Sequence, residues 1–249
     1  MIRIDCISLA DQPERRAYMR QQFEHYQLPY RFFDAIRIAP GSDWPAIYDR
    51  KQRLAHSGID LRPGEMGCYL SHRAVWAEFL AGDDALCLVL EDDVGLSPDF
   101  TGVVEALCAA QADWDVVRLF AMFRKPAFPV RPLTGPYVLV DYLAQPNGTQ
   151  GYLINRDAAE RLLHHTARMS VAIDTALDRD WEHGVQIRGI EPAVLTHDDS
   201  FGTTLGTAQK TPLSPLRKLV REVNRIGTGL RKQLWLLRKK KRLQSSTRD

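Results

Sequence analysis

The sequence predicts an α/β fold, a mostly parallel sheet flanked by helices, and three observations support this prediction. Strand-like and helix-like segments alternate along most of the chain. Residues 85–90 form a continuous apolar run, which is typical of a strand covered on both faces in a parallel sheet. Residues 213–249 differ in composition from the rest and predict a C-terminal basic amphipathic helical tail.

The charge distribution divides the chain into two parts. The 249 residues carry 33 Lys and Arg against 31 Asp and Glu, a net charge of +2. Residues 213–249 hold 12 basic and 2 acidic residues, net +10, so that residues 1–212 carry −8. An apolar fraction of 45% excludes the disordered, collagen-like and disulfide-scaffold classes. We therefore predict a globular domain over 1–212 and a separate tail over 213–249.

The first elements form a β-α unit. Apolar residues largely alternate with polar ones over residues 2–9, which predicts a strand. Asp11 has the look of a helix N-cap and Pro13 that of an early helical residue, and the apolar spacing then predicts a helix to about Gln27. Further helices are expected over 64–81, 98–112, 156–168 and 171–183, and further strands over 30–33, 116–120, 185–190 and the end of 148–155.

Few features of the sequence indicate the cellular compartment. The four cysteines are widely spaced without a CxxC pair, so we interpret them as reduced core residues. The N-terminus lacks the apolar run of a signal peptide, and no stretch approaches the length of a transmembrane helix. These observations predict a cytoplasmic protein.

Three adjacent acids, Glu91, Asp92 and Asp93, follow the apolar run directly. In open α/β sheets, ligands bind outside the carboxyl ends of the strands. The repulsion among three carboxylates is relieved by a hard divalent cation, Mn²⁺ or Mg²⁺, which prefers oxygen ligands. In an extended backbone, Glu91 and Asp93 point to the same side. The alternative is a solvent-facing turn that only ends the strand.

Several sequence blocks occur in an order and spacing that resemble glycosyltransferase family 25, which includes bacterial lipooligosaccharide galactosyltransferases. The resemblance covers roughly residues 2–204. It departs from the family at Ser8, where relatives commonly have Asn, and over residues 118–142, which match nothing assignable. The blocks are ISLADQPERRAYM, GEMGCYLSHRAVW, CLVLEDDV, GTQGYLINRDAAERLL, VAIDTALD and HDDSFGTT.

The resemblance implies a GT-A-type fold whose acidic motif holds a divalent metal on the diphosphate of a sugar nucleotide. Asp93 would be the direct metal ligand, and Glu91 would contact the ribose or reach the metal through water. His197 would be an additional ligand of the metal or diphosphate, although a lone histidine is more often a surface residue. Such enzymes invert the anomeric centre, so a general base must deprotonate the acceptor hydroxyl. Asp174, and less favourably Asp92, are the candidate bases; a helix cap is the alternative for Asp174.

Other candidates for donor binding lie in the same blocks. Ser71 and His72 are adjacent on the expected helix 64–81, so they project about 100° apart and only one is expected to face the donor. The alternative is that both only satisfy neighbours in a packed helix. Arg15 follows the first strand and is expected either to contact phosphate or to lie exposed.

A possible sugar-facing wall is formed by Gln150, Gly151 and Tyr152. The glycine would allow close approach, and the tyrosine ring would stack on an apolar sugar face. A buried strand with a core tyrosine is the alternative.

The tail carries an apolar stripe interleaved with Arg and Lys. Gly227 and Gly229 are expected to divide it into two helices, with Trp235 at a headgroup boundary and a polybasic end at 238–242. This composition predicts binding to an anionic membrane surface. Docking of the apolar face on the domain is the alternative, and nucleic-acid binding is not expected because the rest of the chain is acidic. The stripe comprises Leu216, Leu219, Val220, Val223, Ile226, Leu230, Leu234 and Leu237.

The sequence thus predicts a metal-dependent inverting glycosyltransferase that moves galactose from UDP-galactose to a saccharide acceptor in lipooligosaccharide biosynthesis. It would be peripheral on the inner face of the cytoplasmic membrane. The sequence leaves two alternatives open: a metal-dependent nucleotidyl or phosphoryl transferase, and a non-enzymatic membrane-bound scaffold.

Overall fold

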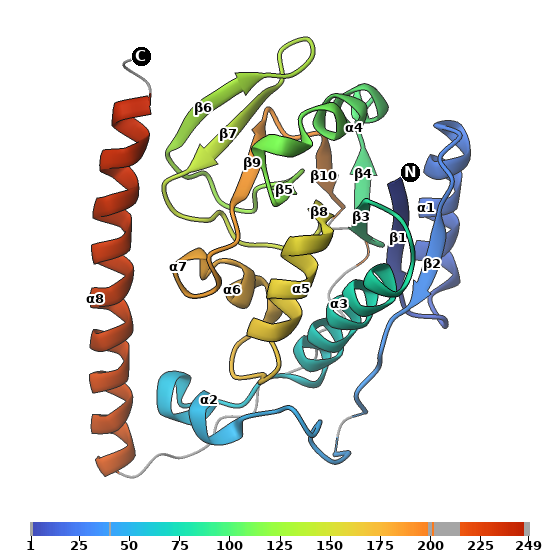
Figure 1. Cartoon of the computed structure of the whole chain (residues 1–249). Helices are drawn as coiled ribbons and strands as arrows, with labels where there is room; N and C mark the ends of the chain where they lie inside the picture. Colours follow the sequence, from blue (N-terminus) through green and yellow to red (C-terminus); the bar gives the residue numbers. More distant parts are fainter. Residues whose placement is uncertain (1, 40, 199–200, 202–214, 247–249) are drawn as a thin grey trace.

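The computed structural model describes residues 2–39, 41–198, 201 and 215–246. It contains a large central sheet with helices on both faces and a long C-terminal helix along one side (Figure 1). The strands are β1 (Ile2–Ser8), β2 (Arg31–Asp34), β3 (Leu86–Glu91), β4 (Val94–Leu96), β5 (Val116–Arg118), β6 (Ala127–Pro132), β7 (Val138–Tyr142), β8 (Gly151–Asn155), β9 (Ile187–Glu191) and β10 (Leu195–His197). The helices are α1 (Pro13–His25), α2 (Arg50–Ser57), α3 (Pro63–Ala81), α4 (Phe100–Ala109), the 3₁₀ turn η1 (Gln111–Asp113), α5 (Arg156–His165), α6 (Ile173–Leu177), α7 (Asp180–His183) and α8 (Pro215–Ser246).

The central sheet has eight strands in the order β2-β1-β3-β8-β5-β9-β7-β6. The pairs β1–β2, β1–β3 and β5–β9 are parallel, while β8 and β7 are antiparallel to both of their neighbours. Six of the eight strands therefore run in one direction, which confirms the predicted α/β fold with a mostly parallel sheet. β4 and β10 form a separate two-stranded sheet.

The strand β3 shows why this sheet is buried on both faces. Cys87 and Val89 pack in a core with α3, α5 and α6, whereas Leu86, Leu88 and Leu90 pack in a second core with α1 and α4. Alternate side chains of a strand point to opposite faces, so an apolar run without polar gaps fills both cores. Burial of each of these larger side chains contributes about 1.5–3 kcal/mol.

Several predicted elements differ in detail. The N-cap of α1 is Gln12, not Asp11. The expected helix over 171–183 is divided into α6 and α7, and β10 follows the strand that was expected to be the last. The unassigned region 118–142 contains the β6–β7 hairpin at the sheet edge.

The tail is one helix, α8, and the prediction of two helices is wrong. Gly227 and Gly229 lie within it, where a Cβ atom would meet nothing within 4 Å. A helical glycine costs about 1 kcal/mol relative to alanine, which weakens a helix without ending it. Trp235 lines a small cavity of about 80 Å³ together with Asp141, Asp180 and Lys239, so it faces the domain and not a headgroup boundary.

Two further predictions can be compared with the structure. All four cysteines are free thiols, with Cys6 and Cys87 buried and Cys68 and Cys108 partly buried. Among the described residues, no helix combines the length and apolarity needed to cross a bilayer. The predicted boundary between residues 212 and 213, Asp199 and most of the block 197–204 lie outside the described residues.

Candidate active site

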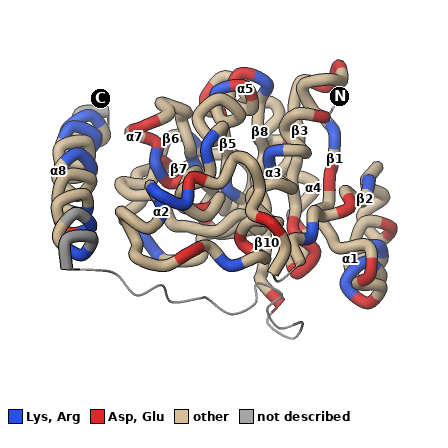
Figure 2. The backbone as a smooth tube through the Cα atoms, turned by 90° about the horizontal axis from the view of Figure 1, so that it is seen from below, with Lys and Arg blue, Asp and Glu red and all other residues tan. Residues whose placement is uncertain are grey.

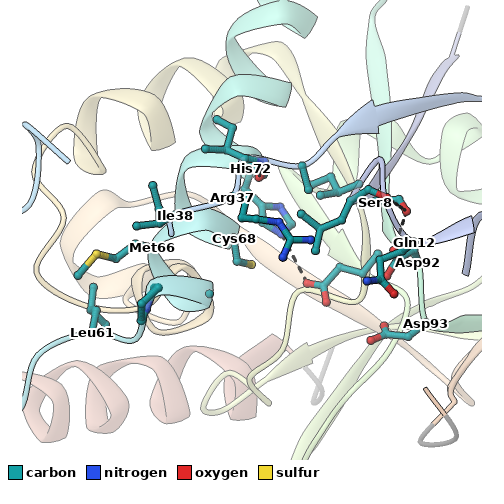
Figure 3. A pocket seen from close by; sticks show the side chains of 18 of the residues that line it. Ser8, Gln12, Arg37, Ile38, Leu61, Met66, Cys68, His72, Asp92 and Asp93 are labelled. Carbon is teal, nitrogen blue, oxygen red and sulfur yellow. Dashed lines mark hydrogen bonds and ion pairs between the residues drawn. The ribbon is translucent and has the colours of Figure 1, made fainter. Parts of the chain in front are cut away.

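A cavity of about 940 Å³ lies beyond the C-terminal ends of β1 and β3. Leu61 and Met66 form an apolar end, and Asp92 and Asp93 lie at the opposite, acidic end (Figure 3). Eight of the predicted site residues line this cavity. They are Arg15, Ser71, His72, Glu91, Asp92, Asp93, Gln150 and His197.

Asp92 is held firmly by two neighbours from the first β-α unit. Its Oδ1 accepts a hydrogen bond from Arg15 Nη1 at 2.6 Å, and its Oδ2 accepts one from Ser8 Oγ at 2.7 Å. The carboxyl group is buried, and both of its oxygens are engaged. This geometry fits a residue that fixes the acidic turn and does not favour Asp92 as the general base. Arg15 is buried as well, so the expectation of an exposed arginine is wrong.

Asp93 is the acid whose bonding capacity remains unfilled. Arg15 Nη1 lies 3.2 Å from its Oδ2. The buried Oδ1 accepts no hydrogen bond from the residues that the structure describes, and His197 Nδ1 is 3.7 Å away from it. Burial, and secondarily the charge of Glu91, raise the pKa of Asp93 to about 6. A partly buried carboxylate with an oxygen free of hydrogen bonds from the described residues, beside an imidazole, is a suitable donor set for a hard divalent cation. Asp93 and His197 therefore fit the expected metal.

Glu91 stands at the end of a chain of buried polar groups. Trp76 Nε1 donates to Tyr152 Oη at 2.8 Å, and Tyr152 Oη lies 2.8 Å from His72 Nδ1. His72 Nε2 faces Glu91 Oε1 at 3.5 Å, an ion-pair distance that is too long for a hydrogen bond. Thr149 Oγ1 donates to Glu91.

The indole of Trp76 determines which group donates and which accepts along this series of hydrogen bonds. An indole N–H only donates, so the Tyr152 oxygen accepts from it and its own O–H is available to donate to His72 Nδ1. The proton of the neutral imidazole then sits on Nε2, toward Glu91. Burial alone would raise the pKa of Glu91, but His72 and Thr149 hold it below its ordinary value. The chain therefore favours an ionised, oriented Glu91.

A second group of metal-ligating side chains adjoins Glu91. Cys68 Sγ, His72 Nε2 and a Glu91 oxygen lie within 4.8 Å of one another. However, the protonated Nε2 offers no lone pair, and burial raises the pKa of the Cys68 thiol well above its ordinary value. Asp93 and His197 are thus the better ligands for a hard cation.

Ser71 and its neighbours join α3 to the segment after β2. Ser71 Oγ accepts from the backbone N–H of Ile36 at 2.8 Å and donates to the Gly67 carbonyl at 2.7 Å. A Cβ atom on Gly67 would lie 2.3 Å from the Ile36 carbonyl oxygen, so only glycine permits this approach. Ser71 therefore shapes the wall of the cavity, and His72 is the member of the pair that faces Glu91.

The predicted sugar-facing wall is wrong for two of its three residues. Gln150 lines the cavity. A Cβ atom on Gly151 would lie 2.2 Å from Leu195 Cδ1, which shows that this glycine serves packing behind the sheet. Tyr152 is 1% exposed and contacts His72 and Trp76, so its ring is not placed to stack on a sugar.

Asp174 lies on α6 and does not line the cavity. Its Oδ1 accepts a hydrogen bond from the backbone N–H of Thr175 at 2.6 Å. The negative charge of Asp174 contributes to the raised pKa of Cys68, which lines the cavity, so Asp174 lies near enough to influence the site. Its role as general base stays a prediction.

Within the described part of the chain, two residues whose side chains bond the acids were not predicted. Ser8 binds Asp92, and Thr149 binds Glu91. The parallel register of Ile7 with Glu91 places the end of β1 beside the acids, and the backbone N–H of Glu91 donates to the carbonyl of Gln150, next to Thr149. Both contacts depend on which strands pair, and this pairing was not predicted from the sequence.

The fold and the acidic cavity define an α/β protein with a ligand site at the carboxyl ends of its strands. The sequence model of glycosyltransferase family 25, described as LPS biosynthesis protein, matches residues 1–177. This match covers more than half of the chain, and the protein belongs to glycosyltransferase family 25.

Individual relatives are similar at a lower level. The lipooligosaccharide biosynthesis protein lic2B of Haemophilus influenzae is 29% identical over 181 residues, which cover 68% of this chain and 66% of that protein. The lacto-N-neotetraose biosynthesis glycosyltransferase LgtB of Neisseria meningitidis is 28% identical and covers 66% of this chain and 61% of that protein. The human inactive glycosyltransferase 25 family member 3 is 32% identical over 45% of this chain and 20% of that protein. The chain thus spans just under two thirds of lic2B and less of the other two.

Proposed function

We propose that this protein is a metal-dependent inverting glycosyltransferase of GT-A type that transfers galactose from UDP-galactose to a saccharide acceptor of lipooligosaccharide. The observation that carries the proposal is the buried Oδ1 of Asp93, which accepts no hydrogen bond from the described residues and lies 3.7 Å from His197 Nδ1 at the acidic end of a cavity of about 940 Å³. The names of lic2B and LgtB support the saccharide acceptor, and other family members are named procollagen galactosyltransferases.

The expected cation would be held by Asp93 and His197. Glycosyl transfer expels a nucleoside diphosphate, and a bound Mn²⁺ or Mg²⁺ would stabilise the charge on this leaving group. Arg15, which pairs with both Asp92 and Asp93, would keep the acidic turn in place whether or not a donor is bound. The acids can therefore remain ordered through a cycle of donor binding and product release.

Glu91 is suited to bind the donor. An ionised carboxylate accepts hydrogen bonds only, and a ribose has two hydroxyl donors. The Nε2–H of His72 and the hydroxyl of Thr149 both face Oε1, so the second oxygen of Glu91 is the one to receive a ribose hydroxyl. Gln150 and His72 line the same cavity, and we propose that they contact the donor as well.

Inversion requires a base on the face of the sugar opposite the leaving group. We propose Asp174 for this role, because both oxygens of Asp92 are occupied by Ser8 and Arg15. In this proposal the acceptor approaches from the side of α6, and the diphosphate lies on the side of Asp93.

We further propose that α8 associates with an anionic membrane surface, at the inner face of the cytoplasmic membrane where nucleotide sugars and lipid-linked acceptors meet. Its basic and apolar composition supports this, whereas the net charge of −8 over residues 1–212 does not favour nucleic acid.

A donor screen tests the proposed reaction. The full chain is incubated with a panel of UDP-sugars and Mn²⁺, and UDP release is measured with and without galactose- or glucose-terminated acceptors. The expected result is UDP release from UDP-galactose that requires both the cation and an acceptor. Release of pyrophosphate would assign the site to nucleotidyl transfer, and no turnover with any donor would place this chain with the inactive relatives.

A further inference from the structure

The outward face of α8 is an exposed apolar stripe. Its six large side chains have between 57% and 63% of their surface exposed and recur every three or four residues. This spacing places them on one side of the helix. A contiguous exposed apolar face of this length marks an interaction surface. The stripe consists of Leu219, Val223, Ile226, Leu230, Leu234 and Leu237.

The opposite face of α8 is docked on the domain, and it is docked mainly by polar groups. The buried ammonium of Lys239 lies 2.9 Å from Asp141 Oδ1 and 3.1 Å from Asp180 Oδ2. Asn224 Nδ2 donates to the carbonyl of Ala55 in α2 at 3.2 Å, and Lys232 Nζ stands 5.4 Å from the centre of the Trp181 ring.

The two faces are nearly opposite each other. Lys239 follows Leu237 by two residues, which is a rotation of about 200° around the helix. A buried lysine is costly unless it stays paired, so the contact with the two aspartates fixes the rotation of the helix. Docking of α8 on the domain and binding of α8 to a membrane were alternatives from the sequence alone. They are compatible, because the six residues of the apolar stripe stay exposed when α8 is docked.

The borders of the stripe are basic. Arg231 and Arg238 lie along one border, and Lys218 and Lys240 lie along the other, all of them exposed. Along 215–246 the chain has eleven basic residues and one acidic residue, Glu222 (Figure 2). A second copy of α8 packed on the stripe would bring positive borders together, whereas anionic headgroups would neutralise both of them.

We propose that α8 is a fixed lipid-binding face: docked through Lys239, it presents the apolar stripe and its basic borders to an anionic bilayer. The inference deepens the membrane association proposed above and rests on it. Because the contacts of Lys239 fix the rotation of α8 about its own axis, the bilayer would lie on the far side of α8 from β7 and α7. The enzyme would then bind the membrane in one orientation.

Vesicle binding of the full chain tests the face itself. We expect co-sedimentation with vesicles containing phosphatidylglycerol and little with phosphatidylcholine alone. L230E/L234E should abolish binding, and R231Q/R238Q should weaken it by about 30-fold at low salt, since each basic residue near the surface contributes roughly 1 kcal/mol. T228A is the control and should bind as the wild type does, because Thr228 lies three turns before Lys239 on the docked side of the helix.

Lipid quenching tests the orientation. Brominated phosphatidylglycerol should quench the added fluorescence of L234W strongly and that of wild-type Trp235 weakly, since Trp235 faces the domain. Strong quenching of wild-type Trp235 would overturn the docked orientation. Binding that ignores lipid charge, or a lipid-free dimer that L230E/L234E dissociates, would overturn the bilayer as the partner. UDP release with a soluble acceptor is measured separately, so failure of catalysis and failure of lipid binding are distinguishable.

Discussion

Two clusters in this protein each combine one buried cation with two aspartates, but only one of them adjoins a large cavity. In each, one cation lies between two aspartates: Arg15 between Asp92 and Asp93, and Lys239 between Asp141 and Asp180. Among the described residues, each cluster has one buried carboxylate oxygen without a hydrogen bond, but Lys239 Nζ lies 2.9 Å from Asp141 Oδ1, whereas Asp93 Oδ1 has only His197 Nδ1 at 3.7 Å. The cluster at Arg15 opens on a cavity of about 940 Å³. The cluster at Lys239 adjoins a cavity of only about 80 Å³. Neither buried ion pairs nor an oxygen without a hydrogen bond therefore identifies a site; what distinguishes the Arg15 cluster is the large cavity and the absence of a close cation at Asp93 Oδ1 among the described residues.

The largest effect should come from Asp93. Asp93→Asn keeps the shape of the side chain but removes the charge, so cation-dependent UDP release should fall by about 10²–10³-fold, as for other groups that stabilise a developing charge. Circular dichroism should show an unchanged fold, because Asp92 still pairs with Arg15. Asp83→Asn, at an exposed position outside the cavity, is the matched control. Turnover near that of the control would remove Asp93 from the metal site.

Lys239 should affect attachment of α8 and leave the cavity intact. Lys239→Met leaves Asp141 and Asp180 buried without their cation, and breaking such a pair costs about 3–5 kcal/mol. We expect faster limited proteolysis within α8 while UDP release with a soluble acceptor is retained. Adding Asp141→Asn and Asp180→Asn should restore part of the protection. Protection that is unchanged in Lys239→Met would show that packing alone docks the helix.

Cation binding at Asp93 should depend on pH. Burial and Glu91 raise the pKa of Asp93 to about 6, so ionised Asp93 is disfavoured in the folded protein and its cost in stability grows as the pH rises from about 4 to 6. A bound cation offsets that cost. Mn²⁺ affinity, followed by calorimetry, should therefore be constant above about pH 7 and fall roughly tenfold per pH unit below about 6. Affinity that stays flat down to pH 5 would contradict a site at Asp93.

The comparison also shows what the sequence could predict. The apolar run before Glu91 located the strand and the acidic turn, because burial on both faces leaves no polar gap. Arg15 was predicted as a site residue, but its pairing with these acids was not: it lies 77 residues before Asp92, and the pairing of β1 with β3 brings them together. Likewise, periodicity carries no information on strand direction, so the reversed strand β8 inside the sheet could not be foreseen.

The tail illustrates a different limit. Helical periodicity identified the apolar stripe on α8 correctly, but it does not show which side of a helix the domain contacts. The contacts that fix that side include Lys239, one lysine within a run of basic residues, whose partners come from β7 and α7. Gly227 and Gly229 were expected to break the helix, yet their intrinsic cost of about 1 kcal/mol each is too small to do so in an otherwise favourable sequence.

The smallest expected effect concerns the polar chain behind Glu91, which has no counterpart in the Lys239 cluster. Tyr152→Phe removes the hydroxyl and leaves Trp76 Nε1 and His72 Nδ1 without it, which should lower the free energy of unfolding by about 1–3 kcal/mol. Tyr69→Phe is the matched control, because Tyr69 is equally buried and its hydroxyl bonds only backbone carbonyls away from the cavity. Both variants should lose stability, but only Tyr152→Phe should free the His72 proton from Nε2, weaken UDP-sugar binding several-fold and shift the acidic limb of the pH profile upward. Equal donor affinity in the two variants would reduce the chain from Trp76 to Glu91 to a packing role.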